Sequence, residues 1–148
     1  MINSASIPEK IRMLFQQQKL AVLATVNDQQ PETFLVAFCA DDSLKRLIIA
    51  TDRNTLKFQQ LQSNPNASLL IHSSKNQESD FQQAMVVSAR GIAAELHGEL
   101  AGEYRELLLE KHPALKDFLS SPEVAIVRIE IDNYRFVEHF QEVFEYQP

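Results

Sequence analysis

Residues 47–67, LIIATDRNTLKFQQLQSNPNA, are the stretch from which the predicted fold of this chain is built. The apolar start, residues 47–50, is typical of a buried β-strand. The second half predicts a helix that ends at Asn64, because Pro65 disfavours a helical conformation in the residue before it. Between strand and helix lies a polar corner, residues 51–54. A corner of this kind, with free N–H groups at a helix start, suits a phosphate, and the alternative is a capped surface helix without a ligand.

The composition is that of an ordinary soluble globular protein, with 45% hydrophobic and 23% charged residues in a chain of 148. The net charge of −6 argues against binding to nucleic acid or to an anionic membrane. Cys39 is the only cysteine, which excludes an intramolecular disulfide and favours a reducing compartment. No stretch resembles a signal peptide or is long enough to span a bilayer, so we expect a cytoplasmic protein. Three glycines are too few for a glycine-rich phosphate loop.

The first half of the chain predicts two helices and four strands. Ser6, Pro8 and Glu9 form a helix start, in which the serine caps the helix and the glutamate completes a capping box. The helices are expected over residues 7–18 and 54–62, and the strands over 20–26, 32–40, 45–51 and 66–73. The first two strands are joined by a short polar turn and should form a hairpin.

The second half predicts a polar loop followed by strands on either side of a helix. The loop covers residues 74–83, a long strand 84–97, a helix 99–110 and a further turn or two 114–119. Gly91 indicates a bulge or a close backbone approach within the long strand. A strand over 123–131, a turn at Asp132 and Asn133, and a last strand over 134–137 complete the pattern. The tail from residue 139 to 146 is too apolar to be free, so we expect it to dock on this chain or on a second copy.

About seven strands joined mainly by short turns, with inserted helices, indicate a mainly-β protein built as a small closed or half-closed antiparallel barrel. We expect one domain over residues 1–148, with an N-terminal helix over 7–18, a barrel over 19–138 and a docked tail over 139–148. The strands over 20–26 and 32–40 are apolar on both faces. A homodimer through the sheet faces would bury the excess apolar surface.

The order of these segments resembles the FMN-binding split barrels related to pyridoxamine 5′-phosphate oxidase. The similar segments are LAVLATV (20–26), ETFLVAF (32–38) after Pro31, LIIATDRNTLK (47–57), NASLL (66–70) after Asn-Pro, and SARGIAAEL (88–96). Together they span residues from about 8 to 138. The resemblance implies a split β-barrel of the FMN-binding type, with Greek-key-like antiparallel strands, in which FMN lies at the interface of a homodimer.

The resemblance also implies which residues bind the cofactor. Thr55 and Lys57 match the hydroxyl and the lysine that hold the FMN phosphate in the family, and Ala50 and Thr51 match the pair that ends the third strand. The segment flanking the flavin ring is matched by Phe34, Leu35, Val36 and Ala37, and the polar corner adds Arg53 and Asn54. A point charge and free N–H groups at the helix start are suited to a phosphate.

Two positions depart from the pattern of the oxidases, because Leu56 and Phe34 stand where those enzymes have arginines. Either FMN binds more weakly, or basic groups from elsewhere replace those lost, with Arg90, Arg128 or Arg135 as candidates. The C-terminal Trp and Arg pattern with which the oxidases hold their substrate is also missing. We therefore do not expect pyridoxamine phosphate oxidation itself.

The resemblance and the polar corner together predict an FMN-dependent oxidoreductase, or an FMN-binding protein, that acts on an unknown small molecule. Because the cofactor performs the electron chemistry, no catalytic residue is assigned. The alternative is a dimeric module without flavin that binds haem, another small ligand or a protein partner. Some split-barrel relatives bind haem through a histidine near the C-terminus, which makes His139 the candidate ligand in that case. The four histidines show no ligand spacing, so no metal site is expected, and Cys39 is interpreted as a buried structural thiol.

Overall fold

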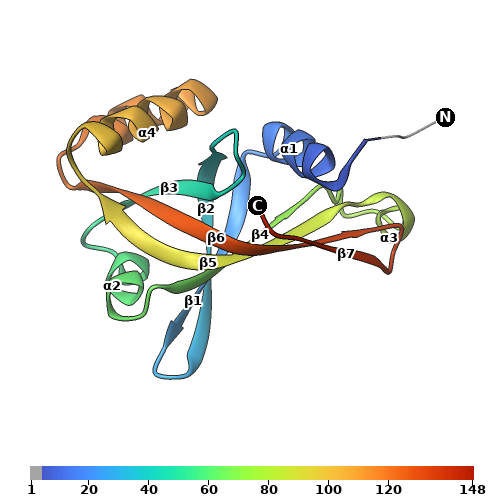
Figure 1. Cartoon of the computed structure of the whole chain (residues 1–148). Coiled ribbons are helices and arrows are strands. Elements are labelled where there is room, and N and C mark those ends of the chain that lie inside the picture. Colours follow the sequence, from blue (N-terminus) through green and yellow to red (C-terminus); the bar gives the residue numbers. More distant parts are fainter. Residues whose placement is uncertain (1–4) are drawn as a thin grey trace.

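The computed structural model describes residues 5–148, and its strands close into an antiparallel barrel (Figure 1). Six strands form the barrel in the order β3-β2-β1-β4-β5-β6, and β3 pairs with β6 to close it. Their bounds are β1 Leu20–Asn27, β2 Gln30–Ala40, β3 Arg46–Asp52, β4 Asn66–His72, β5 Val86–Leu96 and β6 Val124–Glu138. The predicted mainly-β split-barrel fold is therefore confirmed.

The barrel is split between β2 and β3. These strands pair only from Phe38, opposite Ile49, to Ala40, opposite Leu47. The preceding part of β2 is paired with β1 but not with β3. A gap in backbone pairing thus opens beside the end of β3 from which helix α2, Leu56–Ser63, begins.

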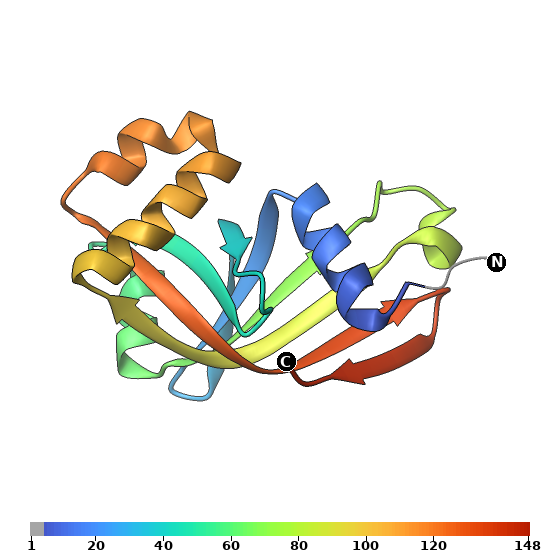
Figure 2. The same cartoon turned by 45° about the horizontal axis from the view of Figure 1, so that its top comes forward.

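The helices surround the barrel. The remaining ones are α1 Ile7–Gln17, α3 Asp80–Gln83, α4 Gly98–Lys111, the 3₁₀ turn η1 Pro113–Leu115 and α5 Lys116–Ser120. The capping box predicted for α1 is present, since Ser6 and Glu9 each accept from the other's backbone N–H. Figure 2 shows α1 and α4 on the same side of the barrel, with the β2–β3 turn between them. None of the helices in the part of the chain that the structure describes is long and apolar enough to cross a membrane.

Two apolar clusters hold these elements together. The larger fills the barrel and takes in the inner side of α1, with Tyr134, Phe38 and Phe136 fully buried. The smaller lies outside the barrel wall, where Ile48 and Ile126 pack against Leu108 of α4 and Leu119 of α5. Burial on both faces of β3 explains why its sequence is continuously apolar instead of alternating.

The expected turn at Asp132 and Asn133 is wrong, because β6 runs unbroken from Val124 to Glu138. Asp132 is an extra residue opposite the step from Arg90 to Gly91 on β5, where the register shifts. A bulge lets a polar turn-forming residue remain within a strand. The close backbone approach predicted at Gly91 is confirmed, since a Cβ there would overlap the Glu130 carbonyl group.

The C-terminal tail docks on its own chain. It forms β7, Glu142–Tyr146, which pairs with the second half of β6. Tyr146 stacks on Tyr134, with 6.3 Å between the ring centroids. The hairpin turns through His139 and Phe140, which both have positive φ. The tail thus pairs with its own chain, which is one of the two possibilities that its apolar sequence allows.

Candidate functional site

A pocket of about 310 Å³ lies at the split in the barrel. One wall comes from β2 and the end of β3, and α2 adds a single cation. The predicted site residues that line it are Leu35, Val36, Ala37, Ala50 and Lys57. The opposite wall is formed by Leu108, Leu115, Phe118 and Leu119 of the α4–α5 segment. This second wall is absent from the sequence prediction, because no local pattern indicates that the segment folds back over β2.

Lys57 is the cation of this pocket. Its side chain is half-buried, and it forms no ion pair with any residue of the described chain. Its Nζ lies 5.9 Å from the centroid of the Phe34 ring, which is a favourable cation–π position. Phe34 therefore borders the pocket through Lys57 and does not itself line it. The free ammonium group can receive an anionic ligand.

The polar corner before α2 is held together by its own hydrogen bonds. Thr55 caps the helix by accepting from Phe58 N at 3.4 Å, and its hydroxyl donates to Asp52 O at 2.7 Å. Its Oγ1 also lies 3.0 Å from Oγ1 of the buried Thr51. Asn54 is exposed, and its backbone N–H donates to the Asp52 carboxylate at 2.8 Å. The Thr55 hydroxyl proton is thus already engaged within the protein.

Two backbone N–H groups in the first turn of α2, those of Leu56 and Lys57, have no hydrogen-bond acceptor among residues 5–148. Together with the Lys57 ammonium group they form a small anion-binding corner at the edge of the pocket. This arrangement fits a phosphate group. Lys57 is the one side-chain cation that the described residues place in the pocket.

Arg53 points away from this corner. Its guanidinium donates to the Glu95 carboxylate at 2.6 and 3.2 Å and to Pro122 O at 2.8 Å. Arg53 therefore fastens the corner to β5 and to the turn before β6. None of the three candidate replacement arginines lines the pocket: Arg90 pairs with Asp132, Arg135 with Glu145, and Arg128 lies 3.6 Å from Glu130.

A second feature is an apolar surface on the outer side of β1, β2 and β4, which we call the outer sheet face. Val22 of β1 lies opposite both Leu35 of β2 and Leu70 of β4. Leu35 is 67% exposed, Leu20 50% and Leu70 39%. Leu35 also lines the split pocket, so the outer sheet face reaches the rim of the pocket.

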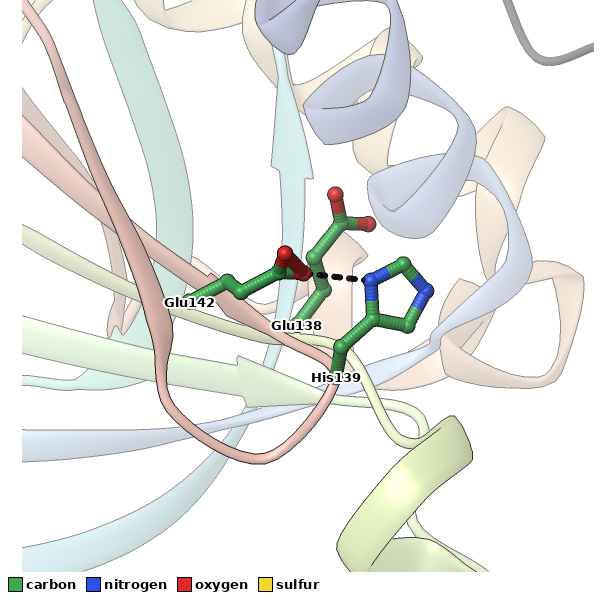
Figure 3. Close-up of side chains that lie close together, drawn as sticks. All are labelled: Glu138, His139 and Glu142. Carbon is green, nitrogen blue, oxygen red and sulfur yellow. Dashed lines mark hydrogen bonds and ion pairs between the residues drawn. The ribbon is translucent and has the colours of Figure 1, made fainter.

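A third feature is a cluster of ligand-type side chains at the β6–β7 turn (Figure 3). Ligand atoms of Glu138, His139 and Glu142 lie within 4.8 Å of one another. His139 Nδ1 is 2.6 Å from Glu142 Oε2, a pairing at i, i+3 that the sequence interpretation did not foresee. The Lys10 ammonium group lies 2.8 Å from Glu138 and already compensates its charge. Glu138 is therefore paired with Lys10 and Glu142 is hydrogen-bonded to His139, and we do not assign a metal ion to the three side chains together.

A closed six-stranded antiparallel barrel with a pocket at the break between two strands defines the split β-barrel class. The sequence matches the pyridoxamine 5′-phosphate oxidase family over residues 7–138, and the chain belongs to this family.

Solved structures show the same fold. General Stress Protein 26 from Bacillus anthracis is 22% identical, with a TM-score of 0.73 over 95% of this chain and 98% of that one. A heme binding protein from Mycobacterium smegmatis is 16% identical with a TM-score of 0.86, and this chain, 99% covered, spans 60% of it. An FAD-binding protein from Mesorhizobium loti is 16% identical with a TM-score of 0.70, over 86% of this chain and 89% of that one. No curated protein matches the sequence.

Proposed function

We propose that the split pocket binds FMN and that the protein is an FMN-dependent oxidoreductase. The observation that supports this most directly is the unpaired Lys57 ammonium group beside two free N–H groups, at one edge of an apolar pocket. The phosphate would be held by Lys57 and the start of α2. Leu35, Val36 and Ala37 would flank the flavin ring, as the family assignment implies.

The protein's own part in the chemistry is binding and the exclusion of water. The α4–α5 wall of Leu108, Leu115, Phe118 and Leu119 removes one side of the pocket from solvent. No carboxylate, histidine or hydroxyl side chain of the described residues lines the pocket, so proton transfer from a side chain is not part of the proposal. Bound FMN supplies the transfer of electrons or hydride to a small molecule.

The test is a binding measurement with two ligands that differ only in the phosphate. The absorption spectrum of the purified protein is recorded first, and flavin fluorescence quenching is then followed on titration with FMN and with riboflavin. Retained flavin bands, or saturable binding of FMN that is tighter than that of riboflavin, would support the proposal. A protein without flavin bands that binds neither ligand would refute it.

We infer that the protein acts as a homodimer through the outer sheet face, which leaves large apolar side chains exposed in one copy. Replacing Leu20 with glutamate should weaken the dimer at least about a hundredfold, because an isologous interface would bury an unpaired carboxylate from each copy. Sedimentation velocity measures this change. Met13 on α1 is 51% exposed, so Met13→Glu is a matched control that should remain dimeric. A monomeric wild-type protein, or an unchanged Leu20→Glu dimer, would contradict the inference.

Haem binding at the β6–β7 turn is a second candidate. The hydrogen bond to Glu142 orients the His139 ring through Nδ1 and leaves Nε2 of this exposed side chain available as a ligand. The Mycobacterium smegmatis protein of the same fold binds heme. A Soret band that appears on haemin addition and is lost in His139→Ala would support this candidate, and an unshifted spectrum of free haemin would exclude it.

We also propose a cytoplasmic location, because the single cysteine is a free, buried thiol.

A further inference from the structure

A separate cleft of about 340 Å³ lies between α1 and α4, above the end of β2. It shares no lining residue with the split pocket. The two helices stand on the same side of the barrel, with the β2–β3 turn between them (Figures 1 and 2). Phe15, Cys39 and Leu107 provide apolar lining, whereas Arg12 and Lys111 provide cations.

Lys111 reaches this cleft from the last turn of α4. Its Nζ donates to Phe15 O at 2.8 Å and lies 3.7 Å from the centroid of the Phe38 ring. It forms no ion pair with a carboxylate of residues 5–148. Ammonium groups removed from water are normally paired with a carboxylate, because an unpaired buried charge is costly. The hydrogen bond to Phe15 O and the Phe38 ring hold the amine in a fixed position, and no carboxylate is paired with it.

Burial of Lys111 favours the neutral amine over the ammonium form. Burial lowers the pKa of Lys111 to about 8, with Lys19 also lowering it and Cys39 raising it. Burial raises the pKa of the Cys39 thiol to about 12, so the thiol in the same cleft stays protonated. This agrees with a structural role for Cys39. Of these two groups, the amine has the lowered pKa and the thiol the raised one.

Arg12 supplies a second recognition element. Its Nε donates to Asp42 O at 3.1 Å, and its guanidinium forms no ion pair within the described chain. The terminal nitrogens can thus donate to a carboxylate or phosphate group of a ligand. The carboxylates of Asp41, Asp42 and Glu110 also line the cleft, and that of Asp41 is paired with Arg46. The other two favour a ligand small enough to reach Arg12 without approaching both of them.

We propose that the cleft between α1 and α4 binds a small aldehyde or ketone that bears an anionic group, with Lys111 as the attacking amine and Arg12 as the anion ligand. Nζ of the neutral amine adds to the carbonyl carbon, and the carbonyl oxygen leaves as water. The product is an imine. No oxidant or reductant is required, and hydrolysis by water returns the free lysine.

The test uses glyoxylate, a small anionic aldehyde, with borohydride reduction to trap the imine and peptide mass spectrometry to locate it. At about pH 8, Lys111 should be labelled about tenfold faster than the exposed Lys75 and Lys116, because the cleft holds its amine in place and burial lowers its pKa to about 8. The rate at Lys111 should rise with pH and level off above about 8. Saturation of the Lys111 rate with glyoxylate concentration should reveal the binding step.

Two variants separate binding from reactivity. Arg12→Gln should reduce labelling of Lys111 by glyoxylate but not by the neutral aldehyde propanal. Lys111→Arg should abolish the label while keeping a cation near Phe15 O, and its thermal unfolding shows whether α1 remains docked. Labelling of Lys111 no faster than of Lys75, or an Arg12→Gln variant indistinguishable from wild type, would overturn the proposal. Neither result bears on FMN binding at the split pocket.

Discussion

Replacing Lys57 with alanine is expected to weaken FMN binding by about ten- to a hundredfold, since hydrogen bonds to charged groups contribute about 1.5–3 kcal/mol. The reason is that Lys57 is the one cation lining the split pocket among the described residues, and no carboxylate competes for it. Riboflavin has no phosphate, so its affinity should change little. Fluorescence titration of both flavins against wild type and variant measures the difference.

Arg53 provides the matched control for this experiment. It lies four residues from Lys57, but its guanidinium is engaged by Glu95 and Pro122 O. Arg53→Gln should therefore leave the FMN affinity within about threefold of wild type and act mainly on stability, since it leaves the Glu95 carboxylate without its partner. If wild type and Lys57→Ala bind FMN with equal affinity, the proposal that Lys57 and the start of α2 hold the phosphate is contradicted.

Replacing Gly91 with alanine is expected to destabilise the fold severely, by about 3 kcal/mol or more, at or beyond the upper end of what most single substitutions cost. A Cβ at this position would overlap the Glu130 carbonyl oxygen and come within 2.8 Å of its carbon. Both atoms belong to the backbone of β6, so no side-chain rotation can relieve the overlap. Urea unfolding of the purified variant measures the loss, and a variant that cannot be purified in folded form would also agree with this expectation.

Gly102 is the control for this substitution, because a Cβ built there meets no atom within 4 Å beyond its chain neighbours and the backbone of its own helix. It lies inside α4, where alanine is favoured over glycine by about 0.5–1 kcal/mol. Gly102→Ala should therefore be as stable as wild type or slightly more so. A Gly91→Ala variant that unfolds within about 1 kcal/mol of wild type would show that β5 and β6 can separate at the bulge.

Features set by neighbours in the sequence are largely predictable from it. The start of α1 follows from Ser6, Pro8 and Glu9, and the end of α2 from Asn64 and Pro65, because caps and proline restrictions act within a few residues. The strands and the bulge at Gly91 also appear in the pattern, since apolar runs and isolated glycines carry the necessary information.

The sequence does not show which distant residues form ion pairs and contacts with one another. The sequence predicts Arg53 as a cofactor-binding residue because it is basic and lies close to Lys57, yet Glu95, 42 positions away, engages it. The wall of the split pocket formed by Leu115 and Phe118 depends on how the α4–α5 segment folds back over β2.

The sequence by itself thus determined most of the helices and strands, their order and the polar corner at the start of α2, because these depend on local backbone preferences and apolar periodicity. Only the tertiary structure decided that β6 continues through Asp132, that Lys57 remains unpaired, and that Lys111 lies beside Phe15 and Phe38. The physical reason is that strand pairing, the burial of a side chain and the presence or absence of an ion-pair partner depend on groups that are far apart in the sequence. No local pattern specifies which of these groups meet.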